Sequence, residues 1–136
     1  MRPVRIVVAG HELVARFEEE AAPRTCAAFR ALLPYTQRII HARWSGEACW
    51  IPLGNFRLDV DFEHATSYPA PGEILFYPGG FSETEILFPY GATRFASKLG
   101  QLAGNHFLTV IEGREHLRAI GERVLWQGAQ EIAFTA

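Results

Sequence analysis

The sequence predicts an all-β domain in which about eight strands close into a barrel and two short helices cover it. Three observations lead to this prediction. Most segments between turn-forming residues have only the length of a strand. Several of these segments alternate polar and apolar residues with a period of two. Eight to ten such strands would leave exposed edges unless the sheet closes on itself. The 136 residues of the chain have the size of a single domain, which we expect to span residues 1–136.

The N-terminal part of the chain is expected to form a hairpin and then a helix. Residues 4–9 are apolar and β-branched, and after a turn residues 13–17 form the returning strand. The acidic residues 18–20 are expected to be solvated. Pro23 suits the first turn of a helix, and Pro34 stops that helix. Its buried stripe consists of Cys26, Phe29, Leu32 and Leu33.

Short strands are expected along the middle of the chain, and several of them have a period of two. They lie at residues 39–45, 48–53, 56–62, 74–77, 83–88, 92–96 and 106–111. The apolar face of the first strand consists of Ile40, Ala42 and Trp44. The hydrogen-bonding residues on its opposite face are His41, Arg43 and Ser45. Tyr90 and Gly91 are expected to turn the chain, and residues 97–105 to form a glycine-rich loop.

The C-terminal part is expected to hold the second helix and a closing hairpin. Residues 114–123 form the helix, with Leu117, Ile120 and Val124 on one side of it. Gly121 weakens that helix. Residues 124–127 and 131–135 then pair as two strands around Gly128.

Composition excludes several classes of function. A net charge of -2 argues against nucleic-acid binding. No apolar stretch approaches the length of a membrane span, and the first residues carry no signal sequence. The two cysteines, Cys26 and Cys49, are too few for a disulfide scaffold or a structural zinc site. We therefore expect a cytoplasmic protein without membrane or nucleic-acid partners, without a metal and without a cofactor.

Five segments carry a resemblance to cyclophilin-like domains. A hairpin followed by AAPRTCAAF at residues 21–29 resembles the opening of such domains, in which a helix plugs one end of an eight-stranded barrel. The other segments are IHARWSGE at 40–47, SYPAPGEILFYPG at 67–79, ETEILFPYG at 83–91 and GQLAGNHF at 100–107. Together they resemble a small bacterial family of uncharacterised proteins with a cyclophilin-like fold, and that family implies no activity.

The resemblance to true prolyl isomerases rests on one residue. Arg43 lies where those enzymes carry the arginine that reaches into their groove, which makes a weak peptidyl-prolyl cis-trans isomerase one alternative function. The QGGD and FxMAN segments that build the rest of that groove are absent from this sequence.

The leading hypothesis is a groove that binds a small anionic or amide-bearing metabolite. Arginine forms forked hydrogen bonds with planar anions, and aromatic residues supply walls, as in most ligand sites. The candidate ligand-binding residues are His41, Arg43, Trp44, Glu47, Tyr77, Glu83, Glu85, Tyr90 and His106. In the alternative interpretation Arg43 pairs with Glu83 or Glu85 across neighbouring strands and binds nothing.

Two further hypotheses use the same residues. Glu83 or Glu85 could act as a general acid or base in a small-molecule enzyme if one of them were desolvated. His41 and His106 could join a carboxylate in a metal site, although no metal-binding spacing supports this. No residue is assigned as catalytic, and a buried Cys49 is expected to be unreactive. The aromatic content of 12% also leaves room for a homo-oligomer interface.

Overall fold

The computed structural model describes all of residues 1–136 and shows a closed antiparallel barrel with two α-helices. The barrel strands run in the order β2-β1-β11-β3-β4-β7-β6-β10, and pairing between β2 and β10 closes the ring. Their bounds are β1 (Val4–Val8), β2 (His11–Phe17), β3 (Tyr35–His41), β4 (Gly46–Gly54), β6 (Glu73–Tyr77), β7 (Thr84–Thr93), β10 (Gly104–Glu112) and β11 (Gln130–Thr135). The predicted fold class is confirmed.

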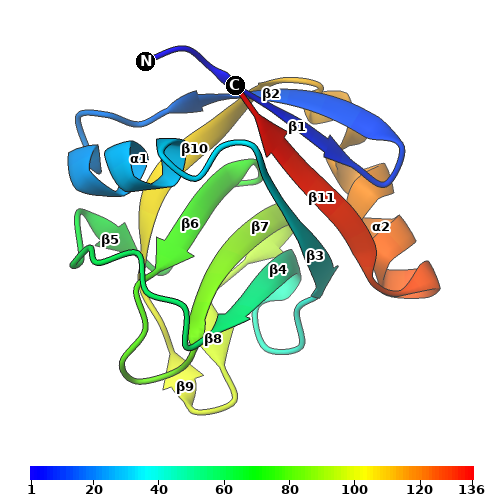
Figure 1. The fold of residues 1–136 in the computed structure, drawn as a ribbon. Coiled ribbons are helices and arrows are strands. Elements are labelled where there is room, and N and C mark those ends of the chain that lie inside the picture. Colours follow the sequence, from blue (N-terminus) through cyan, green and yellow to red (C-terminus); the bar gives the residue numbers. More distant parts are fainter.

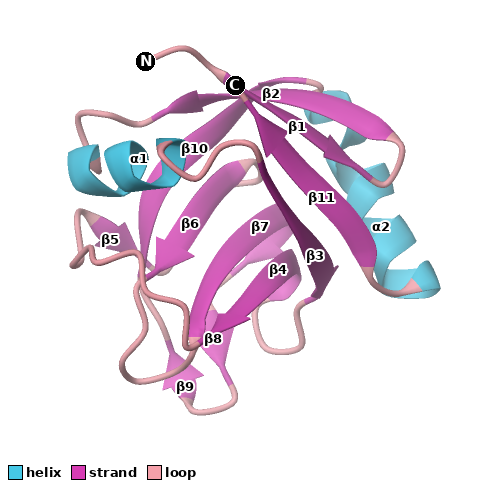
Figure 2. Cartoon of the chain, in the orientation of Figure 1, coloured by secondary structure: helices cyan, strands magenta, loops and turns pink.

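Shorter elements complete the chain. β5 (Ala65–Thr66) extends the sheet beside β10, and β8 (Ala96–Ser97) pairs with β9 (Gly100–Gln101) as a separate hairpin. Figure 1 shows this hairpin at the bottom of the view, below β4 and β7. α1 (Pro23–Arg30) lies beside β10, and α2 (Leu117–Gln127) follows a single 3-10 turn at Arg114–His116. The colouring by secondary structure shows how little of the molecule is helical (Figure 2).

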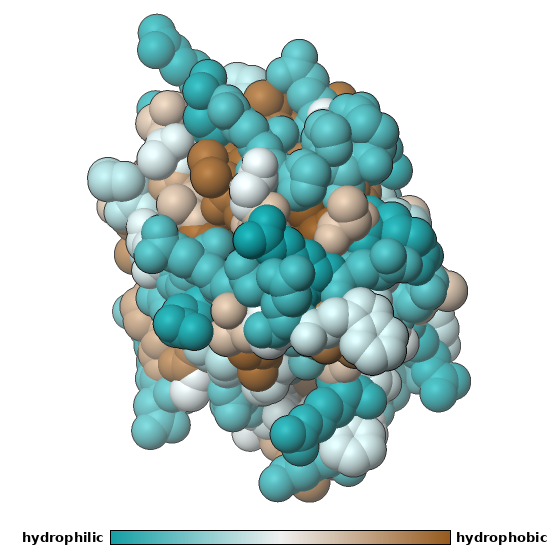
Figure 3. All heavy atoms as spheres, turned by 90° about the vertical axis from the view of Figure 1, so that its right-hand side faces the viewer, coloured by the Kyte–Doolittle hydropathy of each residue, from teal (hydrophilic) through white to brown (hydrophobic).

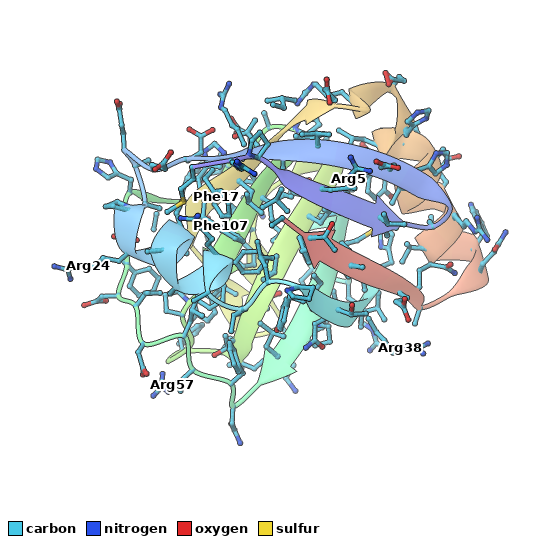
Figure 4. The ribbon with its side chains drawn as sticks, turned by 45° about the horizontal axis from the view of Figure 1, so that its top comes forward. Arg5, Phe17, Arg24, Arg38, Arg57 and Phe107 are labelled. Carbon is cyan, nitrogen blue, oxygen red and sulfur yellow. The ribbon has the colours of Figure 1, made fainter.

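The interior of the barrel is apolar, and α1 covers one of its ends. Phe29 on the buried face of α1 makes edge-on contacts with Phe107 and Phe134, at centroid distances of 5.0 and 5.1 Å. Phe107 is fully buried, and Figure 4 shows it between α1 and the barrel, close to Phe17. α2 packs against β3, β4 and β7, and its buried Leu117, Ile120 and Val124 belong to the same interior cluster.

A second, smaller apolar cluster lies on the outer face of the barrel. Side chains alternate along each strand, so on β7 Ile86 and Phe88 belong to the interior cluster while Leu87 belongs to the outer one. The buried members of this outer cluster are Ala48, Leu75, Tyr77, Leu87, Phe95 and Leu102. Phe95 and Leu102 come from the segment around β8 and β9, which is therefore held against the outside of β4, β6 and β7.

Two predicted strands differ in the structure. The strand expected at 39–45 begins earlier, at Tyr35, and ends at His41, because Ala133 and Phe134 on β11 pair with Thr36 and Tyr35. Arg43 and Trp44 therefore lie in a loop. Residues 56–62 form no strand, because no neighbouring edge pairs with them and Asp59 has a left-handed backbone with φ of 56°.

Three other boundaries were predicted wrongly. Tyr90 does not turn the chain, since β7 continues to Thr93 along β4. Residues 124–127 belong to α2 and not to a hairpin strand; Val124 is buried on the same helical face as Ile120. The first helix ends at Arg30, so Leu32 and Leu33, which were expected on it, lie in the following loop. Both are half-buried and pack against the core.

Candidate functional site

A cavity of about 320 Å³ opens on the outer face of the barrel, beside the outer apolar cluster. This size lies at the lower end of the range of small-molecule sites. We call it the outer pocket. Its lining residues are Ile40, Ala42, Arg43, Trp44, Ser45, Trp50, Ser82, Glu83, Glu85, Ala96, Ser97 and Lys98.

Ser45 fixes the two loops that border the outer pocket. Its hydroxyl donates to the carbonyl of Ala96 at 3.0 Å and accepts the amide N–H of Ala96 at 3.1 Å. The amide N–H of Arg94 donates to the carbonyl of Ser45 at 3.1 Å. The loop that carries Arg43 and Trp44 is thereby bonded to the segment that carries Lys98.

Glu85 is the buried acid of the outer pocket. Glu85 is only 5% exposed, and it lies between Pro52 on β4 and Tyr77 on β6. Burial raises the pKa of Glu85 to about 8, and the nearby charge of Glu83 raises it further. Glu85 is therefore largely protonated at pH 7 in the unliganded protein.

The basic residues of the outer pocket carry no partner. Arg43 and Lys98 are exposed and form no ion pair within 4.0 Å, since the protein's ion pairs involve other residues. Trp44 is 57% exposed beside Arg43, and Trp50 packs against the outer cluster. The pairing of Arg43 with Glu83 or Glu85 in the alternative interpretation is thus absent, and the guanidinium has no ion-pair partner.

The structure brings Arg43, Trp44, Glu83 and Glu85 together in the outer pocket. Glu83 and Glu85 differ in their surroundings, because Glu83 precedes β7 and is exposed, while Glu85 is buried on β7. Arg43 and His41 do not share a strand face either, because β3 ends at His41.

His41, Glu47 and Tyr90 lie instead where α2 meets the barrel. Nε2 of His41 is 2.7 Å from the hydroxyl of Tyr90, and Arg118 of α2 lies over the Tyr90 ring at 5.3 Å from its centroid. Arg118 donates two hydrogen bonds of 3.0 Å to the carboxylate of Glu47, and these bonds lower the pKa of Glu47 to about 2. This arrangement attaches α2 to the barrel.

The two remaining predicted residues have local partners. The hydroxyl of Tyr77 accepts the amide N–H groups of Phe81 and Ser82, each at 3.1 Å, and so fixes the turn before β7. Nε2 of His106 is 2.7 Å from the hydroxyl of Thr109. No group of three or more His, Cys, Asp or Glu side chains is placed to hold a metal ion, and no helix is long and apolar enough to cross a membrane.

Two features of the site were not predicted from the sequence. Lys98 borders the outer pocket from a segment expected to be an irregular loop, and a lone lysine there gave no signal. A second hollow of about 390 Å³ adjoins the outer pocket and shares Ser82 and Glu83 with it. Its lining is entirely polar or glycine, and Arg57 borders it from the loop after β4; Figure 4 shows Arg57 pointing outward from that loop.

The face of the molecule that carries α2 is mostly hydrophilic. In Figure 3 apolar atoms show there only as separate patches between polar and charged side chains. Trp126 on α2 is nevertheless 82% exposed. It does not line the outer pocket.

The closed barrel and its two helices form a cyclophilin-like fold, and comparison with solved structures supports this. A cyclophilin-type peptidyl-prolyl cis-trans isomerase from Cryptosporidium parvum, determined in the presence of the dipeptide Ala-Pro, matches with a TM-score of 0.53 and 17% identity over 88% of this chain and 85% of the isomerase. The solution structure of the hypothetical protein AF2241 from Archaeoglobus fulgidus matches with a TM-score of 0.55 and 14% identity over 98% of this chain and 92% of that protein.

The chain belongs to the family described as protein of unknown function DUF3830, whose model matches residues 4–136. A higher TM-score, 0.75, is found with McbB in complex with tryptophan, at 19% identity. This match covers 97% of the chain but only 44% of McbB, so the chain spans less than half of that protein. These identities show a shared fold alone. No curated protein matches the sequence.

Proposed function

We propose that this protein binds a small anionic or amide-bearing metabolite in the outer pocket, with Arg43 as the anchor for its acid or carbonyl group. The observation that carries the proposal is the unpaired guanidinium of Arg43 beside Trp44, in a cavity that also holds a buried carboxyl group. An arginine fork suits a carboxylate, and the aromatic side chains suit an apolar or aromatic body.

The comparison with McbB agrees with this choice of ligand class. That structure was determined with tryptophan, a small molecule with a carboxylate and an aromatic ring. A similar barrel has therefore been observed in a protein that binds a ligand of the proposed kind.

A thermal-shift screen tests the proposal. The purified protein is unfolded in the presence of aromatic and aliphatic carboxylates, primary amides, tryptophan and the dipeptide Ala-Pro. A ligand at 100 times its dissociation constant adds about 2.7 kcal/mol to the free energy of unfolding and raises Tm by several degrees. We expect a shift with a carboxylate or amide that disappears in Arg43→Ala.

Arg24→Ala is the matched control. Arg24 is exposed on α1 and extends away from the body of the protein (Figure 4), and it does not line the outer pocket. The ligand-induced shift should persist in this variant. A shift that survives Arg43→Ala, or no shift with any compound, would contradict the proposal.

Glu85 supports a second candidate function, acid–base catalysis on the same ligand. A carboxyl group with a pKa of about 8 that faces a cavity has the properties of a general acid or base at neutral pH. Chromatographic analysis after incubation with each bound compound distinguishes the two functions, because only an enzyme consumes its ligand. Loss of turnover in Glu85→Gln with binding retained would favour catalysis.

A further inference from the structure

The charged groups of the outer pocket are separated along the strands. Ala42, next to Arg43, donates its amide N–H to the carbonyl of Ala48 at 2.9 Å, and Ala48 pairs with Pro89 on β7. Glu85 lies four residues before Pro89 on the same strand. At about 3.3 Å per residue, the backbone at the two ends of the pocket is therefore about 13 Å apart.

An aromatic side chain occupies the interval between these ends. Trp50 on β4 pairs with Leu87, midway between Glu85 and Pro89 on β7, and it lines the pocket. At one end are Arg43 and Lys98, on the two segments joined through Ser45. The pocket thus has a basic end, an aromatic wall and an acidic end.

Neither end neutralises the other. No ion pair joins Arg43 or Lys98 to Glu85, and Glu83 is the one charged group that influences the pKa of Glu85. On the flanking strands, Glu85 pairs with Pro52 and with Tyr77, whose hydroxyl binds the turn before β7. The carboxyl group of Glu85 makes no hydrogen bond within the protein, and it is open to the pocket because no fully buried side-chain oxygen lacks a partner.

Building on the proposed function, we infer that the ligand carries a basic nitrogen at the end opposite its acid group, and that Glu85 binds this nitrogen while Arg43 binds the acid. Two neighbouring carboxyl groups, Glu83 and Glu85, disfavour a second anion at their end of the pocket and favour a cation. An ammonium group donates the hydrogen bonds that Glu85 lacks. The ring of Trp50 between the two ends favours a flat or apolar body in the ligand.

Binding of such a ligand is coupled to a proton. Glu85 is mostly protonated at pH 7 when the pocket is empty, because its pKa is about 8. An ammonium group favours the carboxylate form, so its binding releases a proton from Glu85. The affinity for the amine should consequently rise with pH up to about 8.

Three probes with one ring separate the contributions of acid and amine. They are 4-(aminomethyl)benzoate, which has both groups at opposite ends of the ring, 4-methylbenzoate, which lacks the amine, and 4-methylbenzylamine, which lacks the acid. Dissociation constants are measured by titration calorimetry at pH 6.5 and 8.5. We expect 4-(aminomethyl)benzoate to bind about ten-fold or more tightly than 4-methylbenzoate, by a factor that grows with pH.

Variants test whether Glu85 causes the tighter binding of 4-(aminomethyl)benzoate. In Glu85→Gln the two acids should bind with similar affinity at both pH values, while Glu131→Gln should behave like the native protein. Glu131 is a matched control because it is exposed on β11 and lies outside the pocket. Thermal unfolding of Glu85→Gln checks that the fold is intact, and Glu83→Gln, at an exposed position, should reduce the advantage of the amine only in part.

The outcomes separate this inference from the proposed function. If both acids bind equally well in the native protein, and both depend on Arg43, then the acid site stands and the inference of a basic nitrogen is wrong. An amine advantage that persists in Glu85→Gln also overturns it. If none of the probes binds although the broader screen yields a ligand dependent on Arg43, this inference alone fails; if that screen is also negative, both fail.

Discussion

Substitution of Glu85 by glutamine should stabilise the protein in alkaline solution. Glu85 is 5% exposed and its pKa is raised from 4.5 to about 8, so the folded state binds the proton more tightly than the unfolded state. Below pH 4.5 both states are protonated and ionisation costs nothing. Between pH 4.5 and 8 the unfolded state binds fewer protons, so the free energy of unfolding falls as pH rises. Above pH 8 the full penalty is present.

The size of this penalty follows from the shift. A rise of about 3.5 units at about 1.36 kcal/mol per unit corresponds to about 5 kcal/mol above pH 8. Glutamine has a similar shape and cannot ionise, so Glu85→Gln removes this pH dependence. A gain of this size is a large part of the total stability of a small domain, about 5–15 kcal/mol.

Urea unfolding at pH 5.0, 7.0 and 8.5 measures the effect. The free energies of the native protein and of Glu85→Gln should be close at pH 5.0 and diverge progressively toward pH 8.5, with the variant more stable. Glu131→Gln, at an exposed site, should follow the native protein throughout. Parallel pH profiles for the native protein and Glu85→Gln would refute the argument that Glu85 is a desolvated acid without a partner.

Three other predictions concern the surroundings of the site. Gly121→Ala should lower the free energy of unfolding by about 1–3 kcal/mol in urea denaturation, because a Cβ at Gly121 would overlap the ring of Tyr90; unchanged stability would show that α2 does not pack as described. In an NMR titration Glu47 should have a pKa of about 2 that returns toward 4.5 in Arg118→Ala, and no change between the two proteins would contradict the ion pair. Cys26 and Cys49 are buried with pKa values raised to about 12, so the folded protein should not react with a thiol reagent at pH 8 while the urea-unfolded protein reacts at both sites.

The sequence predicted the fold class well because the barrel depends on local patterns. The β-branched run at residues 4–8 and the apolar run at residues 74–77, together with Pro23 at the first turn of α1, are sufficient to place these elements. The predictions were wrong where pairing with another segment of the chain determines whether a strand forms. Residues 56–62 have the alternation of a strand, yet a strand also needs an edge to pair with, and none is available to them.

The site was predictable in part for the same reason. Arg43, Trp44, Glu83 and Glu85 were selected as polar and aromatic residues on adjacent segments, and the structure brings them into one cavity. His41 and Tyr90 are also polar and aromatic residues on adjacent segments, but their strands direct them toward α2 and away from the outer pocket. Burial of Glu85 depends on β4, β6 and the segment around β8, which come together only in the folded protein.

The three tryptophans offer the most direct test of ligand binding in the outer pocket. Trp44 and Trp50 line it, whereas Trp126 is exposed on α2 and serves as an internal control. A ¹H–¹⁵N spectrum resolves one indole N–H signal for each, and single Trp→Phe variants assign them. On titration with a ligand from the screen, the signals of Trp44 and Trp50 should move while that of Trp126 stays, and Arg43→Ala should abolish the change. Movement of the Trp126 signal alone, or equal changes in Arg43→Ala, would contradict a binding site anchored by Arg43.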